Sequence, residues 1–279
     1  MSEMKRAPRQ EASRMRRNSP DQIHSSHRAK VRERENMTIQ DRPTDVLSTG
    51  QRPRPSRFES LCALLSSWEI YPIFLLAAFL HLYRIDTSVF LYDEPSVYRF
   101  AREAITHGFI PLTSNPSSIG TMNPPLMVYL GMIPALFSGN PVWGQALVGF
   151  SNMLAVVLTY ILVRRYYGRV AGSIAALLFT TAVVPFIFSR SFWPQDFLPL
   201  FTVLFLMTIF WGIYERRRGW FAPAVLLVAM AYQLHGSGIF LLAPLALATL
   251  FAWRTLRVRD LLWAGGGLLL LFAPFIYWE

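Results

Sequence analysis

Beyond residue 60 the sequence consists of successive apolar runs, and their length limits the fold more than any other feature. A helix of about 20 apolar residues crosses the hydrocarbon core of a bilayer. Hydrophobic residues make up 53% of the chain, and charged residues are concentrated between the runs. We therefore predict an all-α fold, a polytopic membrane helix bundle of about seven spans. The expected spans are residues 68–83, 142–163, 170–188, 197–214, 220–234, 239–253 and 261–278.

The segment before the first span carries much of the positive charge. Residues 1–57 hold 14 of the 27 Lys and Arg residues and 7 of the 17 Asp and Glu residues, a net charge of +7 (14 minus 7). Low hydrophobicity predicts a disordered basic tail over 1–57 and a transmembrane domain over 58–279. Basic segments stay on the cytoplasmic side, so we expect the tail inside. A nucleic-acid arm is the alternative, but no aromatic residue for base stacking precedes Phe58, so nucleic acid is not an expected partner.

One apolar run is too short to cross. Residues 125–137 form about 20 Å of helix, against a hydrocarbon core of about 30 Å. If this run crossed, the arginines at 164–169 would lie outside, against the bias for positive charge inside. We therefore expect it in the interface, within a long first extracytoplasmic loop over 85–141. The arginines at 216–218 and 254–259 then also face the cytoplasm.

A second interfacial helix is expected in the same loop, beginning near Asp93 and Glu94. Apolar residues recur from Val97 to Ile105 at helical spacing, with charged residues on the opposite face. Such a helix lies flat at the membrane surface. Asp93 is suited to cap it and Glu94 to complement its dipole. Capping alone would explain both residues; a catalytic role is the alternative.

Other polar residues are expected on the extracytoplasmic face, as candidates for binding substrate. Arg190 lies between two spans and suits an oxyanion such as a lipid phosphate, or anchors the chain beside an interfacial Trp. Asp196 either pairs with Arg190 or caps the span that begins at Phe197. His235 faces the same region or is structural. Cys62 is the single cysteine, and no cluster of residues has metal-binding spacing, so no metal site is predicted.

Two motifs and one loop resemble a known family. Residues 92–101, YDEPSVYRFA, look like the Asp-Glu signature of polyprenyl-phosphate-dependent glycosyltransferases of the GT-C type. Residues 123–130, NPPLMVYL, resemble the Pro-Pro-Leu box of the same loop. With residues 189–196, their order is similar to the protein mannosyltransferase-like and aminoarabinose-transferase-like branch, which includes bacterial lipopolysaccharide sugar transferases. The resemblance covers residues 60–279.

The resemblance implies transfer of a sugar from a polyprenyl-phosphate carrier to an extracytoplasmic lipid, glycan or protein. Asp93 matches the proposed general base, and Glu94 would orient it or the acceptor. Arg190 is the candidate cation for the departing phosphate, and Tyr98 would share the face of Glu94. Asn123 stands where relatives often have His or Lys, in contact with phosphate or a metal, so a divalent metal cofactor stays open. Relatives carry further spans, so the chain is expected to be an N-terminal part of such an enzyme.

Two other functions compete with the transferase. A transporter or flippase for a lipid-linked sugar would place polar residues at mid-membrane depth and repeat its helices, and the sequence displays neither feature. In an inactive fragment or membrane scaffold, Asp93 and Arg190 would serve only as cap and anchor. The sequence favours a multi-pass enzyme of the plasma membrane, with its tail cytoplasmic and its active site extracytoplasmic.

Overall fold

The fold is helical throughout the part of the chain that can be described. The computed structural model describes residues 67–87, 93–117 and 120–278, and the predicted tail over 1–57 lies outside them. These residues belong to one compact unit, Ser60–Glu279. They form ten α-helices and no strand, which confirms the predicted all-α class. The helices are α4 (Ile70–Leu82), α5 (Asp93–His107), α6 (Leu126–Ala135), α7 (Val142–Tyr167), α8 (Arg169–Thr181), α9 (Val183–Phe188), α10 (Leu198–Ile213), α11 (Phe221–Leu234), α12 (Leu242–Ala252) and α13 (Val258–Trp278).

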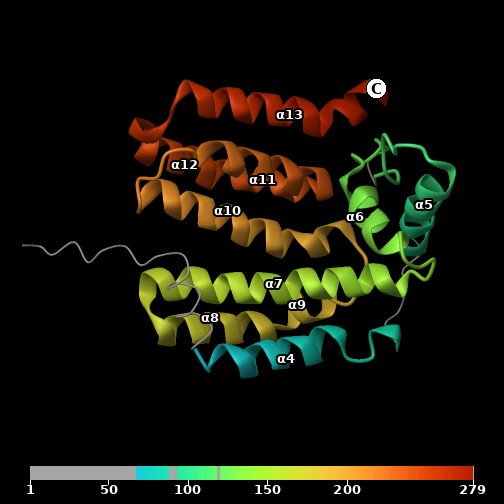
Figure 1. Ribbon diagram of the computed structural model, residues 1–279, viewed down its shortest axis with the longest axis horizontal. Coiled ribbons are helices and arrows are strands. Elements are labelled where there is room, and N and C mark those ends of the chain that lie inside the picture. The colour runs from blue at the N-terminus through green and yellow to red at the C-terminus, as the bar shows by residue number, and fades with distance from the viewer. Residues whose placement is uncertain (1–66, 88–92, 118–119, 279) are drawn as a thin grey trace, which may run out of the picture. The chain divides into compact units, whose positions relative to one another are not determined.

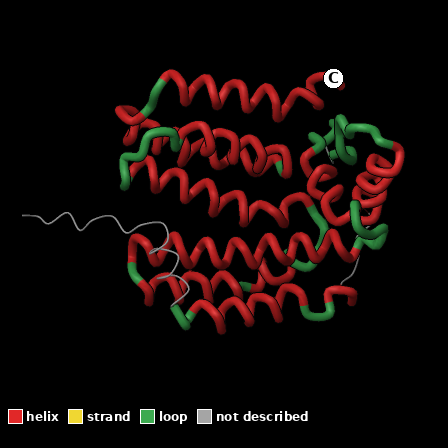
Figure 2. Tube along the Cα trace, in the orientation of Figure 1, coloured by secondary structure: helices red, strands yellow, loops and turns green. Residues whose placement is uncertain are grey.

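The long helices lie side by side as one bundle (Figure 1). Helix α7 packs against α4, α8 and α10, α10 packs against α11 and α12, and α13 rests on α11. Helices α5 and α6 lie together across one end, and the connections gather at the two ends of the bundle (Figure 2). A backbone that makes its hydrogen bonds within each helix can enter lipid, which an irregular loop cannot.

Five helical segments are long and apolar enough to cross a membrane. They are Ile70–Thr87, Val142–Tyr167, Pro194–Ile213, Gly236–Thr255 and Val258–Trp278. Two further predicted spans are shorter: α11 has 14 residues, and the expected span 170–188 is divided between α8 and α9. Helix α6, with 10 residues, is too short to cross, as predicted.

The division between α8 and α9 has a local cause in Pro185. A proline has no N–H to donate to the carbonyl four residues earlier, here that of Thr181, and its ring crowds that carbonyl. The helix therefore ends before it, and Ala182 adopts an extended conformation with ψ of 132°. The proline was present in the predicted span, but its effect was not anticipated. The break directs the chain into the loop at 189–193.

Three groups of buried apolar side chains hold the bundle together. One joins α4, α7 and α8, a second joins α10, α11 and α12, and the third joins α5 and α6 to the ends of α7, α10 and α11. Phe192 lies in the third group, edge-on to Tyr98 at 5.8 Å between ring centroids. This group fixes the interfacial helices against the bundle.

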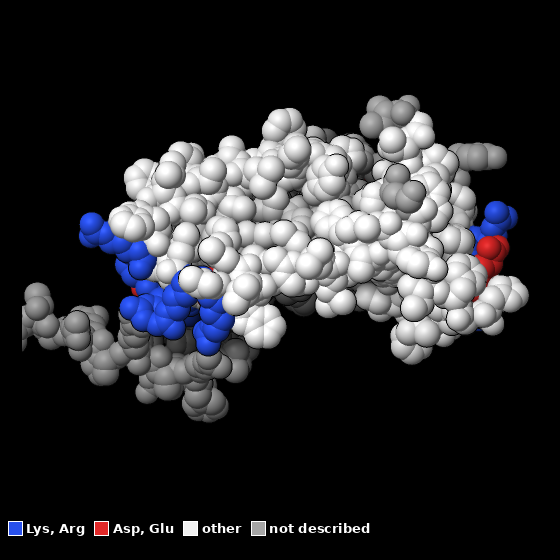
Figure 3. Space-filling model, turned by 90° about the horizontal axis from the view of Figure 1, so that it is seen from above, with Lys and Arg blue, Asp and Glu red and all other residues white. Residues whose placement is uncertain are grey.

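Charge separates the two ends of the bundle. Basic residues gather at one end, which we call the basic end and define by residues 164–169, 215–219 and 253–259. The opposite end, called the loop end, comprises α5, α6 and residues 189–197 and 235–241. Figure 3 displays positive charge at one end, a smaller charged group at the other and uncharged surface between them. The predicted sorting of the loops between two ends is thus confirmed.

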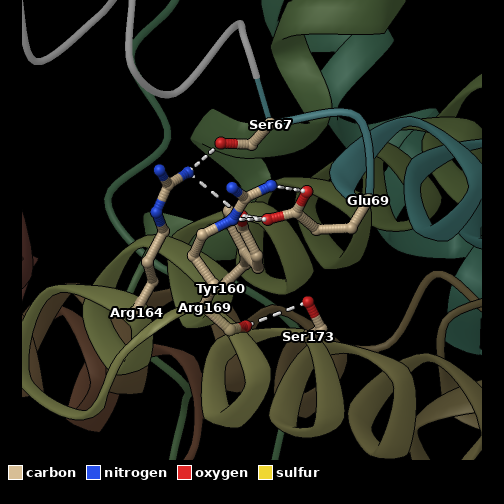
Figure 4. A network of polar contacts seen from close by, with 6 residues as sticks. All are labelled: Ser67, Glu69, Tyr160, Arg164, Arg169 and Ser173. Atoms are coloured by element: carbon tan, nitrogen blue, oxygen red, sulfur yellow. Dashed lines mark hydrogen bonds and ion pairs between the residues drawn. The ribbon is translucent and has the colours of Figure 1, made fainter.

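A polar network closes the basic end between α4, α7 and α8 (Figure 4). Arg169 donates two hydrogen bonds to the Glu69 carboxylate, from Nε at 2.7 Å and from Nη2 at 2.6 Å. The Tyr160 hydroxyl donates to the same carboxylate at 2.7 Å, and Arg164 donates to Tyr160 and Ser67. The hydrogen bonds from Arg169 lower the pKa of Glu69 to about 2.

Candidate functional site

The loop between α9 and α10 is built around the carboxylate of Asp196. It belongs to the 3-10 turn η3 (Pro194–Phe197), and only 2% of the residue is exposed. Its Oδ2 accepts from the Trp193 backbone N–H at 3.1 Å and from the Ser191 hydroxyl. Its backbone carbonyl accepts from Asn152 of α7 at 3.0 Å. Asp196 therefore caps its own turn rather than the helix that begins two residues later, and it makes no ion pair with a described residue.

Glu94 ties the interfacial helix α5 to the same loop. It is 1% exposed, and its Oε2 accepts a hydrogen bond from the Phe192 backbone N–H at 2.9 Å. Glu94 and Asp196 thus accept from consecutive N–H groups, those of Phe192 and Trp193. A buried carboxylate needs such partners to offset the loss of hydration. Two segments 98 residues apart are brought together by this contact.

Asp93, the predicted base, begins α5, but its side chain lies outside the described residues. Val97, one helical turn later, lines a cavity at the loop end. Residues four apart share one face of a helix, so the backbone position of Asp93 lies on the face of α5 that borders this cavity. Its catalytic role stays a prediction.

Arg190 lies at the loop end, where its guanidinium caps the last turn of α4. It donates to the backbone carbonyls of Leu80, Tyr83 and Arg84, at 3.1, 2.8 and 2.9 Å. The carbonyls of Leu80 and Tyr83 have no partner within α4 because the helix ends there, and the Arg84 carbonyl also accepts from Thr87. The proposed contact of Arg190 with a phosphate stays a prediction, and these bonds give the residue a structural role in addition.

Tyr98 and Asn123 occupy supporting positions. The Tyr98 ring is buried and its hydroxyl donates to the Ser138 carbonyl at 2.9 Å, and burial raises the pKa of this phenol. The Asn123 amide donates to the Asn115 carbonyl at 2.9 Å and closes the loop before α6. Asn123 and Asn115 both line the cavity at the loop end, whereas Tyr98 packs behind it.

His235 begins the turn that follows α11. Its Nδ1 accepts from the Ser237 backbone N–H at 3.2 Å and lies 2.8 Å from the Ser237 hydroxyl. The ring therefore caps η4 (Gly236–Leu241), and it also lines the cavity. Of the seven predicted site residues, Asn123 and His235 border this cavity through described side chains, while Glu94 and Asp196 hold the loop that borders it.

The cavity at the loop end has a volume of about 740 Å³. Amide, hydroxyl and imidazole groups share its wall with aromatic rings, and no described lining residue is Asp, Glu, Lys or Arg. The polar residues are Asn115, Ser117, Thr121, Asn123, Gln195 and His235, and the aromatic residues are Phe192, Trp193, Tyr232, Phe272 and Phe275. We call it the polar cavity.

A second cavity, of about 600 Å³, follows the bundle toward the basic end. Its wall is almost wholly apolar beyond the polar groups at its mouth, and we call it the apolar groove. The lining extends along α7 from Asn152 to Thr159, about 10 Å of helix. Gln195 and Asp196 lie at the mouth, and Gln195 also borders the polar cavity.

Several polar residues of this region were not anticipated. Asn152 lies within a predicted span, where a polar side chain is itself a signal of a structural or functional contact. Buried His81 of α4 lies with its Nδ1 2.5 Å from the hydroxyl of Ser189, which donates to the Phe186 carbonyl at 2.8 Å. Ser189 therefore accepts from the ring and is not activated by it. The His81 pair joins α4 to the end of α9.

The described residues offer no ready metal site. Within residues 67–87, 94–117 and 120–278, no three His, Cys, Asp or Glu side chains are grouped closely enough to hold an ion. The carboxylates of Glu94 and Asp196 accept from the loop instead. A divalent metal therefore does not fit this part of the site.

Comparison with known families decides the class of protein. The family model of dolichyl-phosphate-mannose-protein mannosyltransferases matches residues 122–278, more than half of the chain. The chain belongs to this family. No curated protein matches the chain in a search of individual sequences. As a member of the mannosyltransferase family, with five helices long enough to span, the protein is a membrane glycosyltransferase. The matched region contains both cavities except for Val97 and residues 115–121, and the Asp-Glu pair at 93–94 precedes it.

Proposed function

We propose that this mannosyltransferase-family protein transfers a sugar from a polyprenyl-phosphate carrier to a hydroxyl group at the loop end. The observation that carries the proposal is the meeting of the apolar groove and the polar cavity at η3. A lipid-linked sugar likewise has an apolar part and a polar part, since a phosphate joins its long hydrocarbon chain to a hydroxylated sugar ring. The two cavities offer one surface to each part.

The apolar groove suits the hydrocarbon of the donor. Its wall contains side chains from α7, α8, α9 and α10, including Phe179, Val184, Phe188 and Val203. Each methylene that such a wall removes from water contributes about 0.8 kcal/mol. For a lipid already in the bilayer that gain is smaller, and shape and packing decide the affinity instead.

The polar cavity suits the sugar and the acceptor. Amide and hydroxyl groups both donate and accept hydrogen bonds, as sugar hydroxyls do. Aromatic rings such as those of Trp193 and Tyr232 present apolar faces to the C–H groups of a sugar ring. Its volume of about 740 Å³ falls in the range of ordinary ligand pockets, about 300–1,000 Å³.

In the proposed reaction Asp93 is the general base; this is supported by its position at the start of α5, one helical turn before Val97 of the polar cavity. The oxygen of the acceptor hydroxyl bonds to the anomeric carbon of the sugar as the bond from that carbon to the phosphate oxygen breaks. The electron pair of the broken bond leaves on the phosphate, and the hydroxyl proton passes to the Asp93 carboxylate. Glu94 is a positioning residue, because its carboxylate holds the loop through Phe192.

We further propose that the loop end lies outside the cell membrane and the basic end inside. Positive charge is retained on the cytoplasmic side during insertion, and the arginines of three connections lie at the basic end. The tail over 1–57 would then be cytoplasmic. Acceptors are a lipid, glycan or protein hydroxyl presented at the outer surface.

The proposal is tested with the full chain in lipid nanodiscs and a panel of radiolabelled polyprenyl-phosphate sugars that includes the mannose compound. We expect release of sugar to an acceptor or to water in the wild type, at least 100-fold less in Asp93→Asn, and full activity in Asp86→Asn. Asp86 is a matched control because it is an exposed carboxylate at the same end.

Two results would contradict the proposal. Equal turnover by the wild type and Asp93→Asn would mean that Asp93 is not the general base and serves only as a helix cap. Movement of the intact lipid-linked sugar between leaflets without cleavage would identify a transporter.

A further inference from the structure

The turn that contains Gln195 is fixed by hydrogen bonds within the loop, by a hydrogen bond from α7 and by a proline. Asp196, the next residue, accepts from Trp193 and Ser191, and its carbonyl accepts from Asn152. Pro194 begins the turn with a fixed φ. The backbone of Gln195 is therefore fixed against α7, and its side chain extends from a rigid base.

The Gln195 side chain has no hydrogen-bonding partner among the described residues, unlike Asn152 and Asp196 beside it. It is partly exposed and borders both the apolar groove and the polar cavity. Gln195 is the one described residue in the linings of both cavities. An unused amide, with two N–H donors and one carbonyl acceptor, thus lies where they meet.

The position of Gln195 between the two cavities indicates which part of a lipid-linked sugar would contact it. A molecule with its hydrocarbon in the groove and its sugar in the cavity has the phosphate that joins them at Gln195. The cation proposed for this phosphate, Arg190, already donates to three carbonyls at the end of α4. Gln195 supplies a further, uncommitted N–H donor at the junction itself.

The carboxyl groups nearest the junction are already engaged with the loop. Glu94 and Asp196 are buried carboxylates on consecutive N–H groups of the loop. A phosphate diester with one negative charge is bound through hydrogen bonds beside them.

We propose that Gln195 binds the phosphate of the lipid-linked donor through its side-chain N–H groups. The inference rests on the proposed function and extends it to a residue that the sequence did not single out. Gln195→Met keeps the length of the side chain but removes both donors, and Gln195→Glu keeps its shape but adds a negative charge. The two variants separate hydrogen bonding from shape.

The experiment measures binding of polyprenyl phosphate and of polyprenol, the same lipid without phosphate, to the full chain in nanodiscs. A hydrogen bond to a charged group contributes about 1.5–3 kcal/mol, so Gln195→Met should weaken binding of polyprenyl phosphate about 10- to 150-fold. Gln195→Glu should weaken it further, and neither variant should change binding of polyprenol. Thr106→Glu, which adds the same charge at an exposed position of α5, should bind both lipids as the wild type does.

Each other outcome has a separate meaning. If Gln195→Met binds polyprenyl phosphate as tightly as the wild type, the role of Gln195 is refuted and the proposed function is untouched. If both lipids weaken equally in Gln195→Met, the residue shapes the groove and does not bind phosphate. If the wild type does not distinguish polyprenyl phosphate from polyprenol, the donor assignment itself fails. Thermal unfolding midpoints of the variants establish that each one is folded.

Discussion

Removing the carboxylate of Glu94 should loosen the loop that separates the two cavities. In Glu94→Leu the Phe192 N–H loses its described acceptor, at 2.9 Å in the wild type, while Phe192 stays buried among apolar side chains. An unsatisfied buried N–H costs about 1–3 kcal/mol. Since about 1.4 kcal/mol is a factor of ten in an equilibrium constant, opening of the loop becomes about 5- to 150-fold more frequent.

Hydrogen–deuterium exchange measures this opening directly. Peptides that contain the Phe192 amide should exchange about 5- to 150-fold faster in Glu94→Leu. Glu94→Gln keeps an oxygen that can accept from the same N–H, so its exchange should rise less than threefold or so. Glu103→Leu is the control, because Glu103 lies on the same helix but is exposed. Unchanged exchange in Glu94→Leu would refute the inference that this carboxylate holds the loop.

Three further predictions concern the bundle. Gly238→Ala should lower the free energy of unfolding by about 1–3 kcal/mol or more, because a Cβ there would lie 2.4 Å from the carbonyl carbon of Ala231; a denaturation midpoint equal to that of the wild type would contradict this. Asn152→Leu should cost about 1–3 kcal/mol by leaving a buried carbonyl unpaired, measured by thermal unfolding in detergent, and no loss would mean that water replaces the amide. The pKa of Glu69 is lowered to about 2 from its ordinary 4.5, so its stabilising contribution is complete above about pH 4.5 and is lost as pH falls through 2. In Glu69→Gln the thermal unfolding midpoint should therefore depend less on pH in that interval. A pH dependence equal to that of the wild type would exclude Glu69 as the cause.

The sequence was sufficient for the class of fold because the signals are local and strong. Apolar runs specify helices in lipid, and arginine clusters assign each connection to one end. The interfacial position of the short run over 125–137 followed from its length together with the arginines at 164–169. Pro185 causes the break between α8 and α9, but a hydropathy pattern averages over many residues and so does not detect the effect of one proline.

The site was less predictable because its contacts join distant segments. The bond from Phe192 to Glu94 spans 98 residues, and no pattern in either segment specifies the other. Arg190 was identified as an outside cation, but the carbonyls that it caps belong to a helix more than 100 residues earlier. Gln195 drew no attention, since its importance depends on two cavities that exist only after the helices pack.

The network at the basic end has a consequence for the order in which the chain is assembled. Glu69 directly precedes the first span, but Arg169 follows 100 residues later. At about 5–20 residues per second of synthesis, the first helix waits about 5–20 s beside the translocation machinery before its ionic partner is made. During that interval the acidic residue has to be kept hydrated or held by another protein. Helix α4, whose other end is capped by Arg190, thus gains its ionic contact at the basic end only once the hairpin of α7 and α8 has been made.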